Sequence, residues 1–348
     1  MTTRLATDDE IAKWDELITE NPDGGNVFQS AKLAETKRTG GWTPRYIFID
    51  SLAITVLEKP VLLHGKFWYL PKGPGVTNIA ALLPLLPELK AFAATQDVFA
   101  IKIEPEILEQ DETKAQLASA GLVRTRAVQP NVSTVIIDLS PSLDEIMAAF
   151  NQKGRHAIHR AERDGVTAQA VELTDENMKI MFDLLTETAA GRFESSVREL
   201  EYYKKFWQNF AEDGKGSLFF AYLNGEVVAA AYSMYLGKKG LYKDGASVRE
   251  KPAYGASHRL QWEIIKWMKA RGVESYDLCG APHSQDVNNP ESSFYGIGRF
   301  KTSFNKHITD YIGAYDLIVT PAKYKLWQKI GQRLAISLSY RLKRQQWF

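Results

Sequence analysis

Residues 217–236 read SLFFAYLNGEVVAAAYSMYL, and this stretch carries most of the information about the fold. Two runs rich in apolar and aromatic residues flank Asn-Gly at positions 224–225, the strongest short-range signal for a β-hairpin. GLYKDGAS (240–247) predicts a third strand, residues 257–271 have apolar side chains at helical spacing, and SYDLCGAP (275–282) predicts a closing strand. The order of elements is therefore β-β-β-α-β.

The first half of the chain repeats this order. RYIFID (45–50), LAITVLE (52–58) and KFWYL (66–70) predict three strands, residues 79–96 a helix, and VFAIKIEP (98–105) a closing strand. The offset between positions 46 and 219 of the first strands equals the offset between positions 68 and 241 of the third strands. A constant offset in a chain of 348 residues, too long for one ordinary core, predicts a duplicated domain.

The composition excludes several classes of protein. Hydrophobic residues make up 45% of the chain, and 43 lysines and arginines balance 42 acidic residues. These values are typical of a globular protein and exclude a uniformly basic nucleic-acid binder. The single cysteine, Cys279, excludes an internal disulfide, and we expect it to act as a small buried hydrophobe. The first residues lack a signal-peptide pattern, so we expect a cytoplasmic protein without a transmembrane helix.

The β-β-β-α-β order resembles the central sheet of N-acyltransferases that use acetyl-CoA. In that superfamily a Gln/Arg-x-x-Gly-x-Gly/Ala loop before the helix holds the pyrophosphate of CoA. The corresponding loop here, residues 251–256, has Pro252 where Gln or Arg belongs once Gly255 is aligned. We therefore expect the architecture without the cofactor, and acyl-CoA-dependent N-acyl transfer remains the alternative enzyme function.

An ordered set of short stretches resembles the FemABX family of peptidoglycan interpeptide-bridge aminoacyltransferases. The most specific is GIGRFKTSF at 296–304, followed by YIG at 311–313 and DL at 316–317. The others are FQS at 28–30 before GW at 41–42, YLPKGP at 69–74, IEP at 103–105, the basic stretch 155–166, and YD at 276–277 before GAP at 280–282. Together they cover almost the whole chain.

The resemblance implies an α/β (α+β) fold of two tandem GNAT-like acyltransferase domains, with mixed sheets flanked by helices. The first domain would comprise 1–152 plus 318–348 and bind the acceptor substrate, and the second would comprise 153–317. A long heptad run is absent, so the chain is similar to the FemX-like branch without a coiled-coil arm. The implied reaction moves an amino acid from aminoacyl-tRNA to the third-position diamino acid of the stem peptide, in lipid II or UDP-MurNAc-pentapeptide. No cofactor is implied.

Transfer from an activated ester requires positioning of the amine, loss of a proton and stabilisation of an oxyanion. The resemblance favours Lys301 for the oxyanion, although a surface lysine on a strand would fit the local pattern too. It places Glu104 near the acceptor, where a carboxylate can orient or deprotonate the amine.

Substrate-binding roles are also implied by the resemblance. Arg198 and Tyr202 stand four apart on a predicted helix, the family's arrangement for the nucleotide-sugar pyrophosphate, although an exposed surface pair would look alike. The other candidates are Lys37 or Arg38 for a second phosphate contact, Tyr242 for the stem peptide, Phe300 beside Lys301, and Lys72, which is also a plausible turn residue.

Two basic segments are candidates for contact with tRNA or membrane. One carries Lys153, Arg155, Arg160 and Arg163, although a solvated linker helix would look similar. The other is the C-terminal segment 317–348, with seven bases and no acid, where Lys325, Lys329 and Arg333 repeat every four residues. Trp327, Ile330, Leu334 and Leu338 occupy another face of this helix, which can lie on anionic lipid, bind tRNA or pack on the first domain.

Other chemistries receive little support from the sequence. His156 and His159 are three apart, but no third ligand with metal spacing accompanies them, so we expect no metal site. His258 has no serine or cysteine nucleophile motif beside it. A non-catalytic adaptor that keeps the fold while binding tRNA or lipid is the remaining hypothesis.

Overall fold

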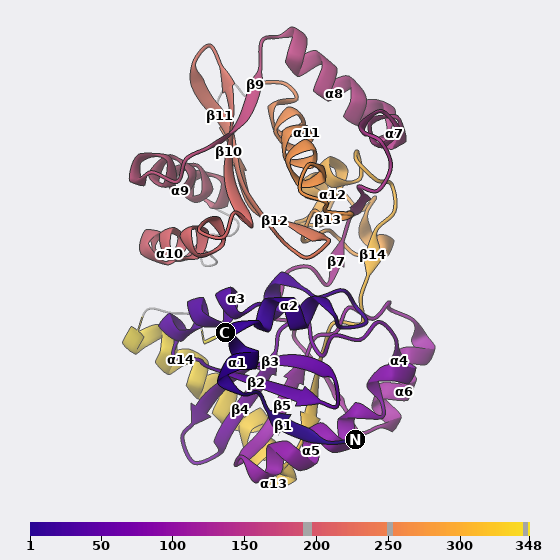
Figure 1. Cartoon of the computed structure of the whole chain (residues 1–348), viewed down its shortest axis with the longest axis vertical. Helices are drawn as coiled ribbons and strands as arrows, with labels where there is room; N and C mark the ends of the chain where they lie inside the picture. The colour runs from indigo at the N-terminus through magenta and orange to yellow at the C-terminus, as the bar shows by residue number, and fades with distance from the viewer. Residues whose placement is uncertain (191–196, 249–252, 344–346) are drawn as a thin grey trace. The chain divides into compact units, whose positions relative to one another are not determined.

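The computed structural model describes residues 1–190, 197–248, 253–343 and 347–348, and it divides into two compact units (Figure 1). Unit 1 comprises residues 1–132 and 310–348, and unit 2 comprises residues 133–309. The expected boundaries at 152/153 and 317/318 differ from this division. Residues 136–138 pair with a strand of the second sheet, and residues 314–318 pair with strands of the first, so strand pairing moves both boundaries.

Unit 1 is built on a seven-stranded sheet. In spatial order its strands are β1 (Thr3–Leu5), β2 (Thr43–Ile49), β3 (Leu52–Val61), β4 (Gly65–Leu70), β5 (Val98–Ile103), β15 (Ala314–Ile318) and β6 (Val123–Thr125). Only the β4–β5 pair is parallel. Strand β15, which follows the whole of unit 2 in the chain, completes the sheet between β5 and β6.

The helices of unit 1 cover both faces of this sheet. They are α1 (Asp8–Ala12), α2 (Trp14–Thr19), α3 (Ala31–Lys37), α4 (Ile79–Leu82), α5 (Leu85–Thr95), α6 (Asp111–Ser119), α13 (Pro321–Leu326) and α14 (Gln332–Lys343). The helix expected over 79–96 is interrupted because Pro84 cannot continue α4 and instead caps α5. Helix α5 packs its buried leucines on Trp68, Leu70 and Ile101.

Successive residues of a strand point to opposite faces, so Phe67 and Phe99 face away from α5. They lie against Trp327 in the π-helical turn η5 (Trp327–Gly331), at ring-centroid distances of 5.7 and 5.6 Å. Trp347 also packs on this face, 5.6 Å from Phe67 and 5.3 Å from Trp42. The C-terminal segment therefore forms part of the core of unit 1.

Unit 2 contains a six-stranded sheet whose order follows the expected β-β-β-α-β pattern. Its strands are, in spatial order, β8 (Ile136–Asp138), β13 (Ser275–Asp277), β12 (Lys239–Ser247), β11 (Glu226–Leu236), β10 (Gly216–Leu223) and β9 (Thr167–Val171). Asn224 and Gly225 form the turn of the predicted hairpin, both with positive φ. The parallel β12–β13 pairing stops at Asp277, while β12 continues to Ser247.

The helices of unit 2 are α7 (Leu143–Ala149), α8 (Gln152–Arg163), α9 (Asp175–Ala189), α10 (Leu200–Ala211), α11 (Ala256–Lys269) and α12 (Tyr295–Lys301). Figure 1 shows α9 and α10 on one face of the sheet and α11 with α8 on the other. The main core lies under α11, where Leu260, Ile264 and Met268 contact residues of β10, β11 and β13. A mixed sheet flanked by helices in each unit confirms the expected fold class.

The described residues also include a two-stranded pair formed by β7 (Ser133–Thr134) and β14 (Thr309–Asp310), and short 3-10 turns. The turns are η1 (Val27–Gln29), η2 (Arg38–Gly40) and η4 (Ser284–Asp286). Among the described residues, every helix is too short or too polar to cross a bilayer.

Candidate functional site

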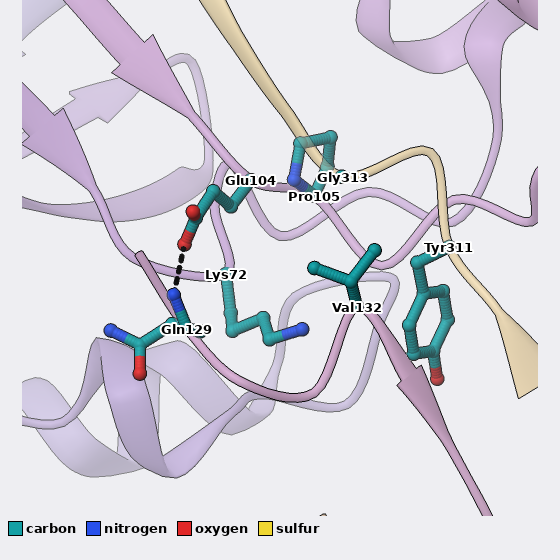
Figure 2. Close-up of a pocket in the computed structure, with 7 residues that line it drawn as sticks. All are labelled: Lys72, Glu104, Pro105, Gln129, Val132, Tyr311 and Gly313. Carbon is teal, nitrogen blue, oxygen red and sulfur yellow. Dashed lines mark hydrogen bonds between the residues drawn. The ribbon is translucent and has the colours of Figure 1, made fainter. Parts of the chain in front are cut away.

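Unit 1 contains a small, partly open pocket lined by side chains from distant parts of the chain (Figure 2). Its lining residues are Lys72, Glu104, Pro105, Gln129, Val132, Tyr311 and Gly313. The stretches YLPKGP, IEP and YIG each contribute to this lining. Three of the stretches that carry the family resemblance therefore meet at one place.

Glu104 is buried at the pocket wall and is held by several donors. Its carboxylate accepts hydrogen bonds from the hydroxyl of Tyr69 at 2.6 Å and from the backbone N–H groups of Val128 and Gln129, the latter drawn in Figure 2. The Gln129 amide also donates to the Tyr69 hydroxyl at 2.9 Å. Burial and the neighbouring carboxylate raise the pKa of Tyr69 well above its ordinary value, so its hydroxyl remains a donor.

Lys72 lies on the same wall, and its environment is more specific than that of a turn residue. Its backbone has a φ of +54°, just before the cis peptide bond between Gly73 and Pro74. The buried Nζ donates to the carbonyl oxygen of Asn131 at 2.8 Å and lies 5.1 Å from the centre of the Tyr311 ring. An ammonium group and a carboxylate thus line the same small pocket.

Lys301 lies in unit 2, at the end of helix α12 rather than on a strand or at the surface. Only 8% of the residue is exposed. Its ammonium group donates to the carbonyl oxygens of Cys279 and Gly280, the second at 2.7 Å, and both residues have positive φ just after β13 ends. Burial lowers the pKa of Lys301, and the neighbouring Cys279 and Asp277 act in the opposite direction.

The surroundings of Lys301 are polar and hydrogen-bonded. Its Nζ lies 5.7 Å from the centre of the Tyr242 ring, on the part of β12 that continues beyond β13. The Asp277 carboxylate accepts from the Cys279 N–H at 2.6 Å and from the Thr134 hydroxyl. Burial raises the pKa of Tyr242 well above its ordinary value, so the phenol stays protonated. Lys301 and Tyr242, both candidates from the sequence, are therefore brought together.

The ring of Phe300 packs against the imidazole of His258. The Phe300 ring lies 4.8 Å from the imidazole, Phe304 stacks on the imidazole at 5.3 Å, and the two phenyl rings lie 5.4 Å from each other. The Nε2 atom of His258 is 3.0 Å from the hydroxyl of Ser303. Burial lowers the pKa of His258 to about 4.

This shift predicts that unit 2 loses stability in acid. Because the unfolded histidine titrates near 6.5, the unfolded chain binds more protons than the folded one between pH 6.5 and about 4. The stabilisation is present above pH 6.5, and about 3 kcal/mol is lost as the pH falls to 4. Hydrogen exchange of unit 2 peptides should show this slope in the wild type and a flatter one in His258→Gln. His159→Gln, which alters an exposed histidine of the same unit, is the control; equal slopes in all three would contradict the prediction.

Arg198 and Tyr202 are adjacent because the guanidinium contacts the ring, and not because they share a helix face. The sequence pattern predicts this helix over residues 195–210, of which 195–196 lie outside the described part. Helix α10 begins at Leu200, so Arg198 precedes the helix instead of sharing its face. The Arg198 guanidinium lies over the Tyr202 ring at 4.7 Å. Contact through the ring keeps the two side chains together.

Lys243 and Asp244 form a partly buried charged pair near Tyr202, which the sequence analysis did not predict. A β-bulge in β12 leaves Lys243 without a partner opposite on β11, and its Nζ is 3.0 Å from Asp244. Asp244 also accepts from the indole N–H of Trp207 at 3.0 Å. The charges of Asp244 and nearby tyrosines raise the pKa of Lys243 despite the opposing effect of burial. The sequence Lys-Asp-Gly inside an otherwise apolar strand is the pattern that could have indicated this charged pair.

Lys37 and Arg38 lie where α3 gives way to η2. Arg38 is exposed, and its guanidinium pairs with Glu35 at 3.0 Å, whereas Lys37 is half-buried at the last residue of the helix. Gly41 follows with a φ of +78° and turns the chain toward β2. The phosphate contact by either Lys37 or Arg38 therefore stays a prediction.

Comparisons with known proteins agree with this fold. A family model described as the FemAB family matches residues 10–128, and one described as an acetyltransferase (GNAT) domain matches residues 149–286. The chain is 24% identical to the lipid II:glycine glycyltransferase of Staphylococcus aureus (strain MRSA252), over 95% of this chain and 97% of that protein. These matches support the FemABX resemblance. The similarity to a glycyltransferase and the GNAT match make the chain a transferase.

Solved structures show the same fold. The crystal structure of FemX superposes with a TM-score of 0.79 at 21% identity, covering 95% of this chain and all (100%) of FemX. The structure of L-PGS from Bacillus licheniformis has a TM-score of 0.51 at 15% identity and covers 94% of this chain and 98% of that one. The FemAB family match, the glycyltransferase similarity and the FemX fold together confirm the resemblance found in the short stretches.

The loop that holds CoA in GNAT enzymes has different surroundings in this chain. Gly255 begins α11 with a φ of +74°, and a Cβ atom there would lie 2.2 Å from the carbonyl oxygen of Ala157 in α8. Helix α8 therefore packs directly against the start of α11, where a pyrophosphate would bind. Pro252 lies outside the described residues.

The basic residues of α8 divide into two groups. Arg155 donates to the carbonyl oxygens of Ala148 and Phe150, so its charge is used to hold the end of α7. Arg160 stacks over Tyr254 at 4.5 Å, while Lys153 and Arg163 are exposed.

On the C-terminal helix, Lys325, Lys329 and Arg333 are exposed along one row. Among the described residues, no His, Cys, Asp and Glu side chains gather as a metal site.

Proposed function

We propose that this FemABX chain transfers an amino acid from aminoacyl-tRNA to the side-chain amine of the third-position diamino acid in the peptidoglycan stem peptide. The acceptor is lipid II or UDP-MurNAc-pentapeptide, and the product begins the interpeptide bridge. The likeness to a lipid II:glycine glycyltransferase over 95% of the chain supports this assignment. The proposed location is the cytoplasm, including the inner face of the membrane, where both substrates meet the enzyme.

The observation that carries the proposal is the buried ammonium group of Lys301. Two of its three N–H bonds are used by Cys279 and Gly280, which fix the direction of the third within the described part of unit 2. A preorganised positive charge in a buried site stabilises a developing oxyanion more strongly than the same charge in water. The chemistry of ester aminolysis needs a group of this kind.

The step balances without a cofactor. The acceptor nitrogen forms a bond to the carbonyl carbon of the aminoacyl ester, and the oxygen of that carbonyl becomes the oxyanion beside Lys301. The bond from the carbon to the ribose oxygen of tRNA then breaks. One proton leaves the amine and one is delivered to the departing ribose oxygen, so the products are an amide and free tRNA.

The other residues are assigned roles within their own units. In unit 1, we assign Lys72 and Glu104 to acceptor binding, with Glu104 orienting the amine, and either Lys37 or Arg38 to a phosphate. In unit 2, Arg198 and Tyr202 bind the pyrophosphate region, and Tyr242 and Phe300 line the reaction site with Lys301. Lys153, Arg160 and Arg163 supply the basic surface for tRNA. Arg155 contributes less to this surface, because its guanidinium donates hydrogen bonds to carbonyl oxygens at the end of α7.

A mass assay tests the reaction directly. The protein is incubated with a muramyl pentapeptide nucleotide or with lipid II, together with each charged tRNA or with acetyl-CoA, and the products are weighed. An increase of one amino-acid residue that disappears after ribonuclease treatment is the expected result. Acetylation without tRNA would instead establish the acyl-CoA alternative, and tRNA binding without any product would favour an adaptor.

Glu104 offers a prediction for acceptor use. Glu104→Gln keeps the size of the side chain but removes its charge, so it weakens the attraction for an ammonium-bearing acceptor while Tyr69 retains an acceptor for its hydrogen bond. We expect kcat/KM for the acceptor to fall about tenfold or more, with little change in KM for the charged tRNA. Glu109→Gln, which alters a carboxylate on the same unit outside the pocket lining, is the control. Equal kinetics for both variants would remove Glu104 from the proposed site.

A further inference from the structure

The turn between β3 and β4 in unit 1 exposes two leucines. Leu62 and Leu63 are 85% and 86% exposed, more than any other large hydrophobic residue in the described part of the chain. Leu63 also has a φ of +65°, a left-handed conformation that is unfavourable for a leucine and that Gly, Asn or Asp would adopt more readily. The stability of unit 1 does not explain leucines at this position.

The C-terminal helix exposes a second set of apolar side chains. Leu326, Ile330 and Leu334 follow one another at intervals of four residues, with exposed fractions of 45%, 52% and 54%. Trp327 and Gly331 face the sheet instead and are buried. The expectation that Ile330 and Leu334 share the face of Trp327 is therefore wrong, because successive residues of a helix lie about 100° apart and only the Trp327 side reaches the sheet. Leu338 has no described side chain.

The turn and the helix are held against each other. The imidazole of His64, the residue after Leu63, lies 6.0 Å from the Trp327 ring. A Cβ atom at Gly331 would lie 3.2 Å from the same imidazole, so a glycine allows this close approach. The turn and the helix are therefore adjacent, and we call their five exposed apolar residues the apolar surface: Leu62, Leu63, Leu326, Ile330 and Leu334.

Positive charge flanks the apolar surface. Lys325, Lys329 and Arg333 each precede one of its helical residues, and all three are exposed. From Leu317 to Phe348 the sequence contains no aspartate or glutamate. A helix with an uncovered apolar row beside a basic row is complementary to the interface of an anionic bilayer, where acyl chains lie beneath phosphate groups.

We propose that the apolar surface inserts into the headgroup region of an anionic phospholipid bilayer, with Lys325, Lys329 and Arg333 on the lipid phosphates. RNA offers no comparable partner for five exposed aliphatic side chains, because its affinity comes from phosphate neutralisation and base stacking. The leucines of the turn therefore distinguish a membrane from tRNA as the occupant. This binding goes beyond the proposed transfer reaction and depends on neither substrate.

Flotation of the full chain with vesicles tests the proposal. We expect binding to phosphatidylcholine vesicles that contain phosphatidylglycerol and much weaker binding to phosphatidylcholine alone. The double variants Leu62→Ser with Leu63→Ser, and Ile330→Ser with Leu334→Ser, should each weaken binding about tenfold or more. Leu5→Ser, at a leucine 49% exposed on the edge strand β1, is the matched control and should bind like the wild type.

The basic row is tested separately. Changing Lys325, Lys329 or Arg333 to alanine should each weaken binding to anionic vesicles about fivefold, with a smaller effect at high salt. Lys90→Ala, at an exposed lysine of α5 on the opposite face of the sheet, should have no effect. Point variants are preferable to a truncation because residues 337–348 include Trp347, which is buried against Trp42 and Phe67.

Three results would overturn the proposal: no binding of the wild type to anionic vesicles, unchanged binding of both leucine variants, or loss of tRNA binding alone in the basic variants. Thermal unfolding of each variant verifies that the exposed substitutions leave the fold intact. The vesicles contain neither charged tRNA nor a stem peptide. Failure of vesicle binding and failure of the transfer reaction are therefore separate outcomes.

Discussion

Replacing Lys301 with methionine should reduce kcat for aminoacyl transfer by a factor of about 100 to 1,000, the loss typical for one oxyanion donor in a buried site. Methionine fills a similar volume and removes the charge. The affinities for charged tRNA and for the acceptor should stay within about threefold of the wild type, because Lys301 is assigned to the transition state and not to the ground state. Single-turnover kinetics with labelled aminoacyl-tRNA would measure the chemical step.

A control is needed because Lys301 also holds two backbone carbonyls in unit 2. Its removal leaves the oxygens of Cys279 and Gly280 without this donor, at a cost of about 1–3 kcal/mol per buried group. Thr134→Val loosens the same region by removing the donor to Asp277, but leaves the ammonium group in place. If Thr134→Val lost stability and activity in the same proportion as Lys301→Met, Lys301 would be a structural residue only.

The largest effect on stability is expected at Lys102 in unit 1. Its Nζ lies 2.9 Å from the carboxylate of Asp316, and both side chains are almost fully buried. Asp316 also accepts from the hydroxyl of Tyr324 at 3.0 Å, so the pair joins β5 to β15 and α13. Lys102→Met leaves a buried carboxylate without its counter-ion and should destabilise unit 1 by about 3–5 kcal/mol.

The double variant Lys102→Met with Asp316→Leu separates charge burial from packing. Because replacing a whole buried ion pair with apolar residues is often nearly neutral, most of the lost stability should return. Hydrogen exchange of peptides from β5 and β15 measures the effect within unit 1 alone. An unfolding curve of the whole chain would combine the unfolding of both units. Lys90→Met is the exposed control. A loss below about 1 kcal/mol in the single variant would contradict the argument.

Local sequence predicted the elements that depend on neighbouring residues. The hairpin at Asn224-Gly225 and the helix after it follow from turn chemistry and spacing within a few residues, and both appear in unit 2. The same reasoning failed at Arg198, where the helix begins two residues later. It did not predict the helix that ends at Lys301, because a short stretch with two glycines has no clear helical period.

Long-range contacts account for what the sequence could not predict. The pocket with Lys72 and Glu104 needs Tyr311, which follows the whole of unit 2 in the sequence, and no local pattern indicates this meeting. The exposure of Ile330 and Leu334 depends on which helical row reaches the sheet, a choice made by Phe67 and Phe99. The resemblance selected residues in both units, but their side-chain partners required the structure.

The discontinuous make-up of unit 1 sets an order on biosynthesis. As the chain leaves the ribosome, the continuous segment 133–309 has all of its strands while the first sheet still lacks β15 and its aromatic covering. Domains generally fold as units once their residues are available. Unit 2 can therefore finish folding first, and the N-terminal strands must wait with an open sheet edge until the C-terminal residues emerge. During that interval, β5 and β6 are the segments most in need of protection by chaperones.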